Sequence, residues 1–99
     1  MEERSFIVPD EMAEEAEAVV RLLKEAARAQ RLGDEVSLRR PEPGEPGQES
    51  LTAVVLFIGA STAGWLTKEW LETYLWPLIR QRIDAPSRRF VDWLNDRLP

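Results

Sequence analysis

The chain has 99 residues, and 18 acidic against 13 basic side chains give it a formal net charge of −5. Cysteine and histidine are both absent, which excludes disulfides, Cys/His zinc sites, iron–sulfur clusters and any catalytic arrangement that needs a thiol or an imidazole. This length suits a single domain. Residues 1–35 carry ten acids and five bases, and such an acidic half argues against a nucleic-acid partner, which needs a basic face.

The first 39 residues predict a strand–helix–strand unit. Residues 5–8 are a short apolar run closed by Pro9, which is typical of an edge strand because proline ends the hydrogen-bond ladder. Residues 36–39 alternate apolar and polar side chains and predict a second strand. A crossover connection between two such strands favours a parallel, right-handed arrangement.

The helix of this unit is predicted over residues 11–32. Its apolar side chains recur at spacings of three and four, so they form one stripe along a helix. Asp10 is the expected N-cap and Gly33 the expected C′ residue. Glu17 and Arg21 stand four residues apart and are expected to form an ion pair on its surface.

Residues 40–49 are predicted to be a linker. Three of the seven prolines and two of the five glycines fall in this segment. Proline fixes φ and removes a donor while glycine frees the backbone, so neither a helix nor a strand is expected to persist. The segment is therefore expected to be an extended, solvated spacer.

Residues 51–66 contain no charged side chain, and they are predicted to begin a long helix capped by Ser50. Beyond Leu66 the pattern becomes amphipathic as far as Ile79, and Pro77 is expected to kink or restart the helix. Residues 86–98 predict a short final helix.

The predicted fold class is α+β, with all segments in one domain. Residues 1–39 form the strand–helix–strand unit, residues 40–49 the linker, and residues 50–99 a helical assembly segment. Two parallel strands alone are not stable in water. Their pairing within or between chains is left open by the sequence.

The apolar run is short for a membrane span. Sixteen helical residues extend about 24 Å, whereas a bilayer core is about 30 Å thick. Extension of the span to residue 79 would bury Lys68, Glu69 and Glu72 at a cost of several kcal/mol. The tryptophans could still anchor the helix at an interface. The alternative is therefore a peripheral or single-pass membrane protein with Arg80, Arg82, Arg88 and Arg89 at the headgroups.

The small residues of the run indicate close packing against another segment. Gly59 with Ala63, and Ala60 with Gly64, are pairs that let two helix backbones approach. One amphipathic helix cannot cover a segment that is apolar all round, so part of its surface is expected to face another chain or lipid. The predicted interface residues are Val55, Phe57, Ile58, Gly59, Ala63, Gly64, Trp65, Trp70, Tyr74 and Trp76.

Catalysis is not expected. Glu69 and Glu72 are a pair that could share a metal ion or a proton, but such pairs are more often a solvated face, and a carboxylate-based enzyme remains a distant alternative. No catalytic, cofactor-binding or metal-binding residue is predicted. The expected partner is a second copy of the chain or a larger protein, with membrane contact left open.

The order of elements resembles the effector-associated constant component type of small bacterial proteins. The resemblance covers about residues 5–82: strand, helix, strand, the spacer 41–45, then the Gly/Ala/Ser-rich apolar segment and a Trp/Leu/Arg segment. It implies a non-enzymatic companion of peptidase or nucleotide-dependent effectors in bacterial conflict systems. The expected function is thus an accessory or adaptor subunit that assembles through an apolar helix. A cytoplasmic location is expected from the absence of cysteine and of an export signal, with the inner membrane as the alternative.

Overall fold

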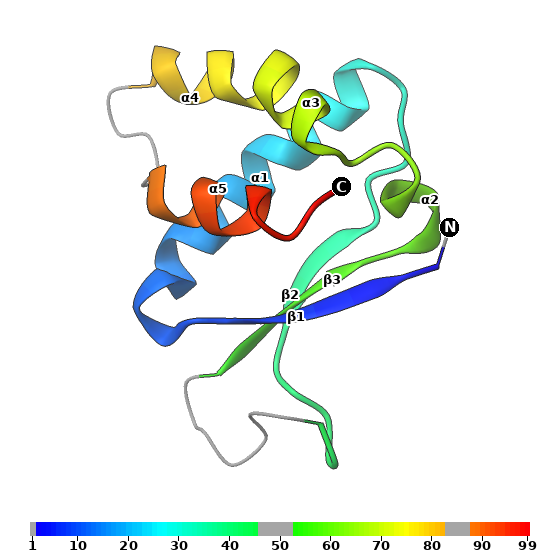
Figure 1. Ribbon diagram of the computed structural model, residues 1–99, viewed down its shortest axis with the longest axis vertical. Helices are drawn as coiled ribbons and strands as arrows, with labels where there is room; N and C mark the ends of the chain where they lie inside the picture. The colour runs from blue at the N-terminus through cyan, green and yellow to red at the C-terminus, as the bar shows by residue number, and fades with distance from the viewer. Residues whose placement is uncertain (1, 46–52, 83–87) are drawn as a thin grey trace.

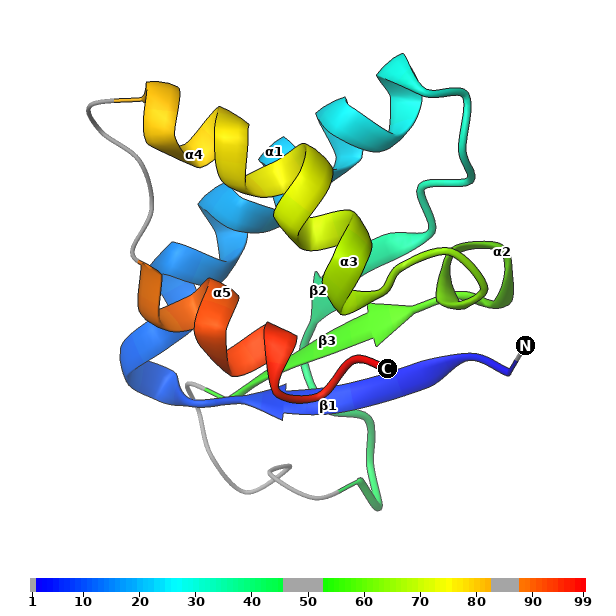
Figure 2. The same cartoon turned by 45° about the horizontal axis from the view of Figure 1, so that its top comes forward.

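A computed structural model, which describes residues 2–45, 53–82 and 88–99, shows an α+β fold with helices over one face of a three-stranded sheet (Figures 1 and 2). In chain order the elements are β1 (Arg4–Val8), the 3-10 turn η1 (Asp10–Met12), α1 (Ala13–Ala29), β2 (Val36–Arg39), β3 (Val54–Ile58), α2 (Ala60–Ala63), α3 (Lys68–Trp70), the π segment η2 (Leu71–Leu75), α4 (Trp76–Gln81) and α5 (Arg88–Asn95).

The sheet has the strand order β1–β3–β2, and β3 is antiparallel to both of its neighbours. Phe57 lies opposite Ser5 on one side and Ser37 on the other. The two predicted strands, β1 and β2, therefore run in the same direction but do not pair with each other. This is a split β-α-β arrangement, in which a third strand of the same chain fills the gap.

The long helix predicted from Ser50 through Leu66 is wrong. Within the described residues, 54–58 form the central strand β3 and 60–63 the short helix α2, while Ser50 and residues 51–52 lie outside them. A short continuous apolar run does not distinguish a buried strand from a buried helix, and β-branched and aromatic side chains such as those of 54–58 favour the strand. Because these residues form a strand, the alternative of a helical membrane span over this run is wrong as well.

The apolar run is enclosed by the chain itself. Leu56 and Ile58 are each 1% exposed, and Val55 is 2% exposed. Leu56 and Ile58 share the core with the stripe of α1, including Ala16 and Val19, and with the helical segments that follow β3. The inference that another chain or lipid must cover this run is therefore wrong for its strand, whereas Gly64 and Trp65 near its end reach the surface at least in part. Within the described segments, no helix combines the length and the apolar character that crossing a bilayer requires.

Helix α1 confirms most of the predicted helix but differs at both ends. Asp10 lies inside the turn η1, and Met12 takes the N-cap position. At the other end, Arg31 adopts φ 60°, and Leu32 donates its N–H to the carbonyl oxygen of Ala27 at 2.9 Å. This is the hydrogen bond of a Schellman motif, so Arg31 rather than Gly33 is the C′ residue.

The segment Lys68–Gln81 is helical, and a wide turn accommodates its proline. Thr67 caps the start by accepting a hydrogen bond from the N–H of Trp70 at 3.2 Å. In η2 the N–H of Trp76 bonds to the carbonyl of Leu71, five residues back. Pro77 lacks an N–H and would crowd the carbonyl four residues earlier, so a π turn just before it lets α4 begin without a break.

The basic cluster near the C-terminus ties the last helices to α1. Arg89 binds Glu15 at 2.7 Å, and Arg82 binds Glu25 at 3.2 Å. Arg88 lies 5.4 Å from the ring centre of Trp76. Three of the four arginines proposed for lipid headgroups thus have partners inside the chain. The predicted ion pair between Glu17 and Arg21 is absent from the described residues.

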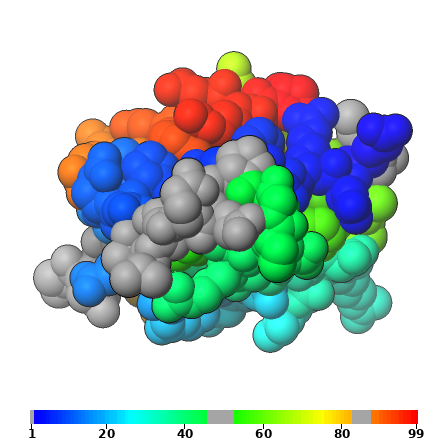
Figure 3. Space-filling view, turned by 90° about the horizontal axis from the view of Figure 1, so that it is seen from below, coloured from blue at the N-terminus to red at the C-terminus, as the bar shows by residue number. Residues whose placement is uncertain are grey.

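The sheet face opposite the helices is partly covered by the segment that follows β2, drawn in green at the centre of Figure 3. Arg39 binds Glu45 through two hydrogen bonds of 2.6 and 3.0 Å. This contact, with the backbone N–H of Glu42, lowers the pKa of Glu45 to about 2. The described part of the predicted linker is thus folded back on the sheet, and its residues 46–49 lie outside the described structure.

Candidate interaction surface

The ten predicted interface residues do not form one surface. Half of them are buried in the chain's own core: Val55, Ile58, Gly59, Ala63 and Trp70. The other half reach the surface at least in part: Phe57, Gly64, Trp65, Tyr74 and Trp76. Phe57 lies on β3, and Trp76 lies beneath the guanidinium of Arg88, so neither joins the remaining three.

Three aromatic side chains from the predicted set do come together. The rings of Trp65 and Trp70 have centroids 4.6 Å apart, and those of Trp70 and Tyr74 are 5.6 Å apart. Gly64 is exposed beside Trp65. We call these four residues the aromatic surface. Trp70 is its buried base at 7% exposure, whereas Tyr74 is 43% exposed.

Both indoles of the aromatic surface are fixed by hydrogen bonds to the end of α1 and the loop after it. Trp65 donates its Nε1–H to the carbonyl oxygen of Gly33 at 3.1 Å. Trp70 donates its Nε1–H to the amide oxygen of Gln30 at 3.3 Å. Because each indole N–H already has an acceptor, neither tryptophan would gain a hydrogen bond by moving. The two rings therefore form a rigid platform.

Tyr74 is presented by the π segment. It lies in η2, where one backbone turn holds an extra residue, and its ring rests on Trp70. Its hydroxyl makes no hydrogen bond within the part of the chain that is described. The charged side chains of Lys68, Glu69 and Glu72 are exposed on the same helical segment. Single π turns occur often at functional sites.

A set of hydrogen bonds around Thr62, which we call the polar lock, joins the segment that carries the aromatic surface to the sheet. Thr62 is completely buried; its hydroxyl donates to the carbonyl oxygen of Gly33 and accepts the N–H of Glu35, both at 2.8 Å. Gly59 donates its N–H to the carbonyl of Glu35 at 2.7 Å, and the Ser61 hydroxyl donates to the Glu35 carboxylate. The segment after β3 is therefore anchored to the loop before β2.

The lock explains one of the glycines that the sequence pattern assigned to helix contacts. A Cβ at Gly59 would lie 2.5 Å from Oε2 and 2.6 Å from Cβ of Glu35, so the close approach of the two loops requires glycine. At Gly64 a Cβ would meet nothing within 4 Å. Gly59 is thus a packing residue, and Gly64 is an open surface position.

Sequence reasoning missed the residues that hold the aromatic surface in place. Gln30, Gly33, Glu35 and Thr62 come from two distant segments, and no regular spacing links them. The one available signal was the succession of an apolar β-branched run, a glycine and a Ser-Thr pair, which is typical of a strand that turns into a short helix.

The chemistry of the aromatic surface suits binding. It offers apolar ring area and one phenol hydroxyl. Across the described ranges, no group of three or more Asp and Glu side chains is placed to hold a metal ion. Comparison of the chain with known protein families, with curated proteins and with solved structures finds no match. The function is therefore argued from the surface itself.

Proposed function

We propose that the chain is a non-catalytic accessory or adaptor subunit that binds another protein chain through the aromatic surface. The observation that carries the proposal is Tyr74, which is 43% exposed while its ring rests on the buried Trp70. Tyrosine and tryptophan are enriched among the residues that dominate binding energy at interfaces. A rigid aromatic pair loses little conformational entropy when it is covered.

The surroundings of Tyr74 support the same proposal. Lys68, Glu69 and Glu72 are exposed on the same helical segment, so charged side chains accompany the apolar rings, as is usual at an interface. Gly64 leaves room beside Trp65, so a partner side chain can approach the indole ring. The partner in this proposal is a second copy or a larger protein. Placement beside an effector in a bacterial conflict system, and in the cytoplasm, rests on the sequence alone.

Photo-crosslinking in the cells that naturally contain the protein tests this proposal. Benzoylphenylalanine replaces Tyr74 in one variant and Glu72, which is exposed two residues away in the same helical segment, in the control. We expect an adduct of defined mass from position 74 that is at least several-fold stronger than any adduct from position 72. A mass of twice the chain identifies a second copy, and a larger mass identifies another protein. Equal adducts from both positions, or none, would contradict the proposal.

A further inference from the structure

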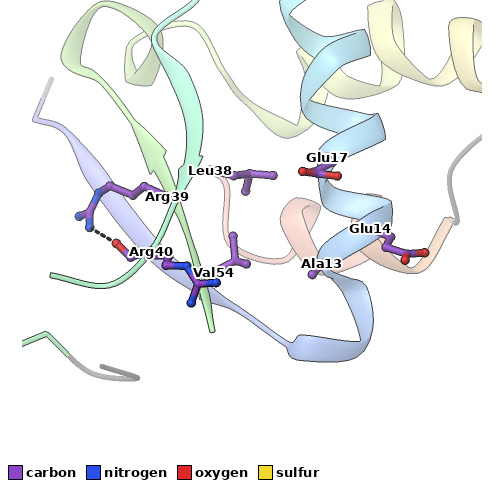
Figure 4. A pocket seen from close by; sticks show the side chains of 7 residues that line it. All are labelled: Ala13, Glu14, Glu17, Leu38, Arg39, Arg40 and Val54. Carbon is purple, nitrogen blue, oxygen red and sulfur yellow. Dashed lines mark hydrogen bonds between the residues drawn. The ribbon is translucent and has the colours of Figure 1, made fainter. Parts of the chain in front are cut away.

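The outer edge of β2 has no neighbouring strand among the described residues, because the sheet order is β1–β3–β2. An edge strand turns alternate N–H and C=O groups outward, where they can pair with another strand. At this edge the N–H of Val36 already donates to the carbonyl oxygen of Asp34 at 2.7 Å. Helix α1 runs beside this edge. A pocket of about 340 Å³ opens between them, lined by Ala13, Glu14, Glu17, Leu38, Arg39, Arg40 and Val54 (Figure 4).

A stripe of charged residues on α1 follows this edge from one end to the other. Its members are spaced alternately by three and four residues and therefore share one helix face: Glu14, Glu17, Arg21, Lys24 and Arg28. We call them the α1 stripe. Because its first two residues line the pocket with Leu38, the acidic half of the stripe lies beside the end of β2.

The basic half of the α1 stripe lies beside the beginning of β2. Arg28 donates to the carboxylate of Asp34 at 2.6 Å, and Asp34 stands two residues before the strand. This hydrogen bond, assisted by the charge of Lys24, lowers the pKa of Asp34. Along the α1 stripe the charge thus changes from negative to positive between the two ends of β2, with Arg40 also lining the acidic end and Asp34 already bound to Arg28 at the basic end.

The acidic end of the stripe is not neutralised within the described part of the chain. Glu14, Glu17 and Arg21 make no hydrogen bond or ion pair there. In Figure 4 the side chains of Glu17 and Leu38 point toward each other across the pocket, and Arg39 points away toward Glu45. An apolar floor with an unpaired acidic wall therefore faces the groove.

A strand edge flanked by a stripe of this polarity is complementary to itself. In an antiparallel pairing of two β2 strands across a two-fold axis at Ser37, Val36 of one copy lies beside Leu38 of the other. The same axis reverses the α1 stripe, so Glu14 and Glu17 of each copy face the basic half of the other, while the two Arg21 side chains meet at the axis. Glu17 then lies near Lys24 of the second copy, and Glu14 near Arg28.

We propose that two copies of the chain associate through their β2 edges, forming a continuous six-stranded sheet with the two α1 stripes side by side. The occupant of the groove is a second copy because the reversed stripe places Glu17 opposite Lys24 and Glu14 opposite Arg28 on both sides of the axis, which outweighs the single Arg21 pair at the axis. This surface is separate from the aromatic surface, and the proposal does not depend on the proposed function.

A charge swap tests the contact between the two stripes. Glu17→Lys and Lys24→Glu each make two like-charged pairs in the symmetric dimer, and we expect each to raise the dissociation constant on the order of tenfold or more, measured by sedimentation equilibrium. An equimolar mixture of the two variants, and the double variant, should regain wild-type affinity. Residues 17 and 24 lie two helix turns apart within one chain, so this rescue must act between chains.

Disulfide trapping tests the position of the axis, and the chain offers a matched control. Because the sequence has no cysteine, Ser37→Cys and Ser5→Cys each introduce the sole thiol. Both serines are exposed and lie opposite Phe57, at opposite edges of the sheet. Mild oxidation should give the Ser37→Cys variant a covalent dimer at least tenfold faster than the Ser5→Cys variant.

These measurements overturn the proposal if the wild-type chain stays monomeric at 100 µM, roughly the limit for an interface of useful strength. Failure of the charge swap to restore association, or equal trapping at positions 5 and 37, overturns it as well. Circular dichroism melts of each variant separate a lost contact from a lost fold. Photo-crosslinking at Tyr74 reports on the other surface, so the two proposals can fail independently.

Discussion

The hydroxyl of Thr62 donates to the carbonyl oxygen of Gly33 at 2.8 Å and, at the same distance, accepts the N–H of Glu35. One buried side chain thus joins the helix after the central strand to the loop before an edge strand. Because Trp65 donates to the same Gly33 carbonyl, this lock also sets the position of the aromatic surface.

Replacement of Thr62 by valine should destabilise the fold strongly. The N–H of Glu35 loses its acceptor and the Gly33 carbonyl loses one of two donors, beside a side chain that is completely buried. We expect the free energy of unfolding to fall by about 2 to 4 kcal/mol, measured by urea denaturation. Thr62→Ser retains the hydroxyl and should cost less than half as much. Equal losses would show that packing of the methyl group, rather than hydrogen bonding, is decisive.

Substitution by alanine should change the free energy of unfolding differently at the two glycines that flank α2. At Gly59 the new Cβ would lie 2.6 Å from Cβ of Glu35, which cannot move without its backbone, so we expect a loss of about 1 to 3 kcal/mol in unfolding free energy. Gly64→Ala should change it by less than about 0.5 kcal/mol or stabilise the chain slightly, because nothing lies within 4 Å. A reversed order would refute the close approach of the two loops.

The carboxyl group of Glu45 should titrate with a midpoint near 2. Its pKa is lowered to about 2 from an ordinary value of 4.5, chiefly by the hydrogen bonds from Arg39. A lowered folded-state pKa means that the contact stabilises the fold above pH 4.5 and that this contribution is lost as the pH falls toward 2. Carboxyl NMR titration measures the midpoint, and in Arg39→Ala it should return most of the way to 4.5.

Two ion pairs between α1 and the C-terminal half should contribute unequally to the stability of the fold. The Glu15 side chain is only 20% exposed and its Oε2 is buried without a described partner, so Arg89→Ala would leave a poorly solvated carboxylate unpaired. Glu25 is 62% exposed and loses little when Arg82 is removed. Urea midpoints should therefore fall clearly for Arg89→Ala and hardly at all for Arg82→Ala. Indistinguishable midpoints would show that Glu15 is hydrated without Arg89.

The predicted α+β class and most of α1 were accessible from the sequence because they depend on local periodicity. The stripe of Ala16, Val19 and Leu23 repeats at helical spacing and is buried as expected. Strand β3 was not accessible in the same way. A central strand is covered on its helix face and partly on its other face, so apolar and polar residues do not alternate along its sequence. Residues 54–58 also merge with the uncharged residues that follow them.

The aromatic surface could be predicted only in part from the sequence. Trp65 and Trp70 were chosen as interface residues, but five residues apart on one helix they would point in directions differing by about 140°. The break between α2 and α3 turns them toward each other, at 4.6 Å between ring centroids. That break depends on Thr62 reaching across to Gly33, a contact between segments 29 residues apart that no local pattern contains.

The native mass of the chain in a gently prepared extract of its own cells tests the proposed function most directly. The wild-type chain, of 11.4 kDa, should elute from size exclusion in an assembly that Tyr74→Ser removes or shrinks, because the anchoring ring is lost. The Glu72→Ser variant, altered at an exposed position of the same helical segment, should elute with the wild type. Co-elution of all three proteins at one mass would contradict binding through the aromatic surface.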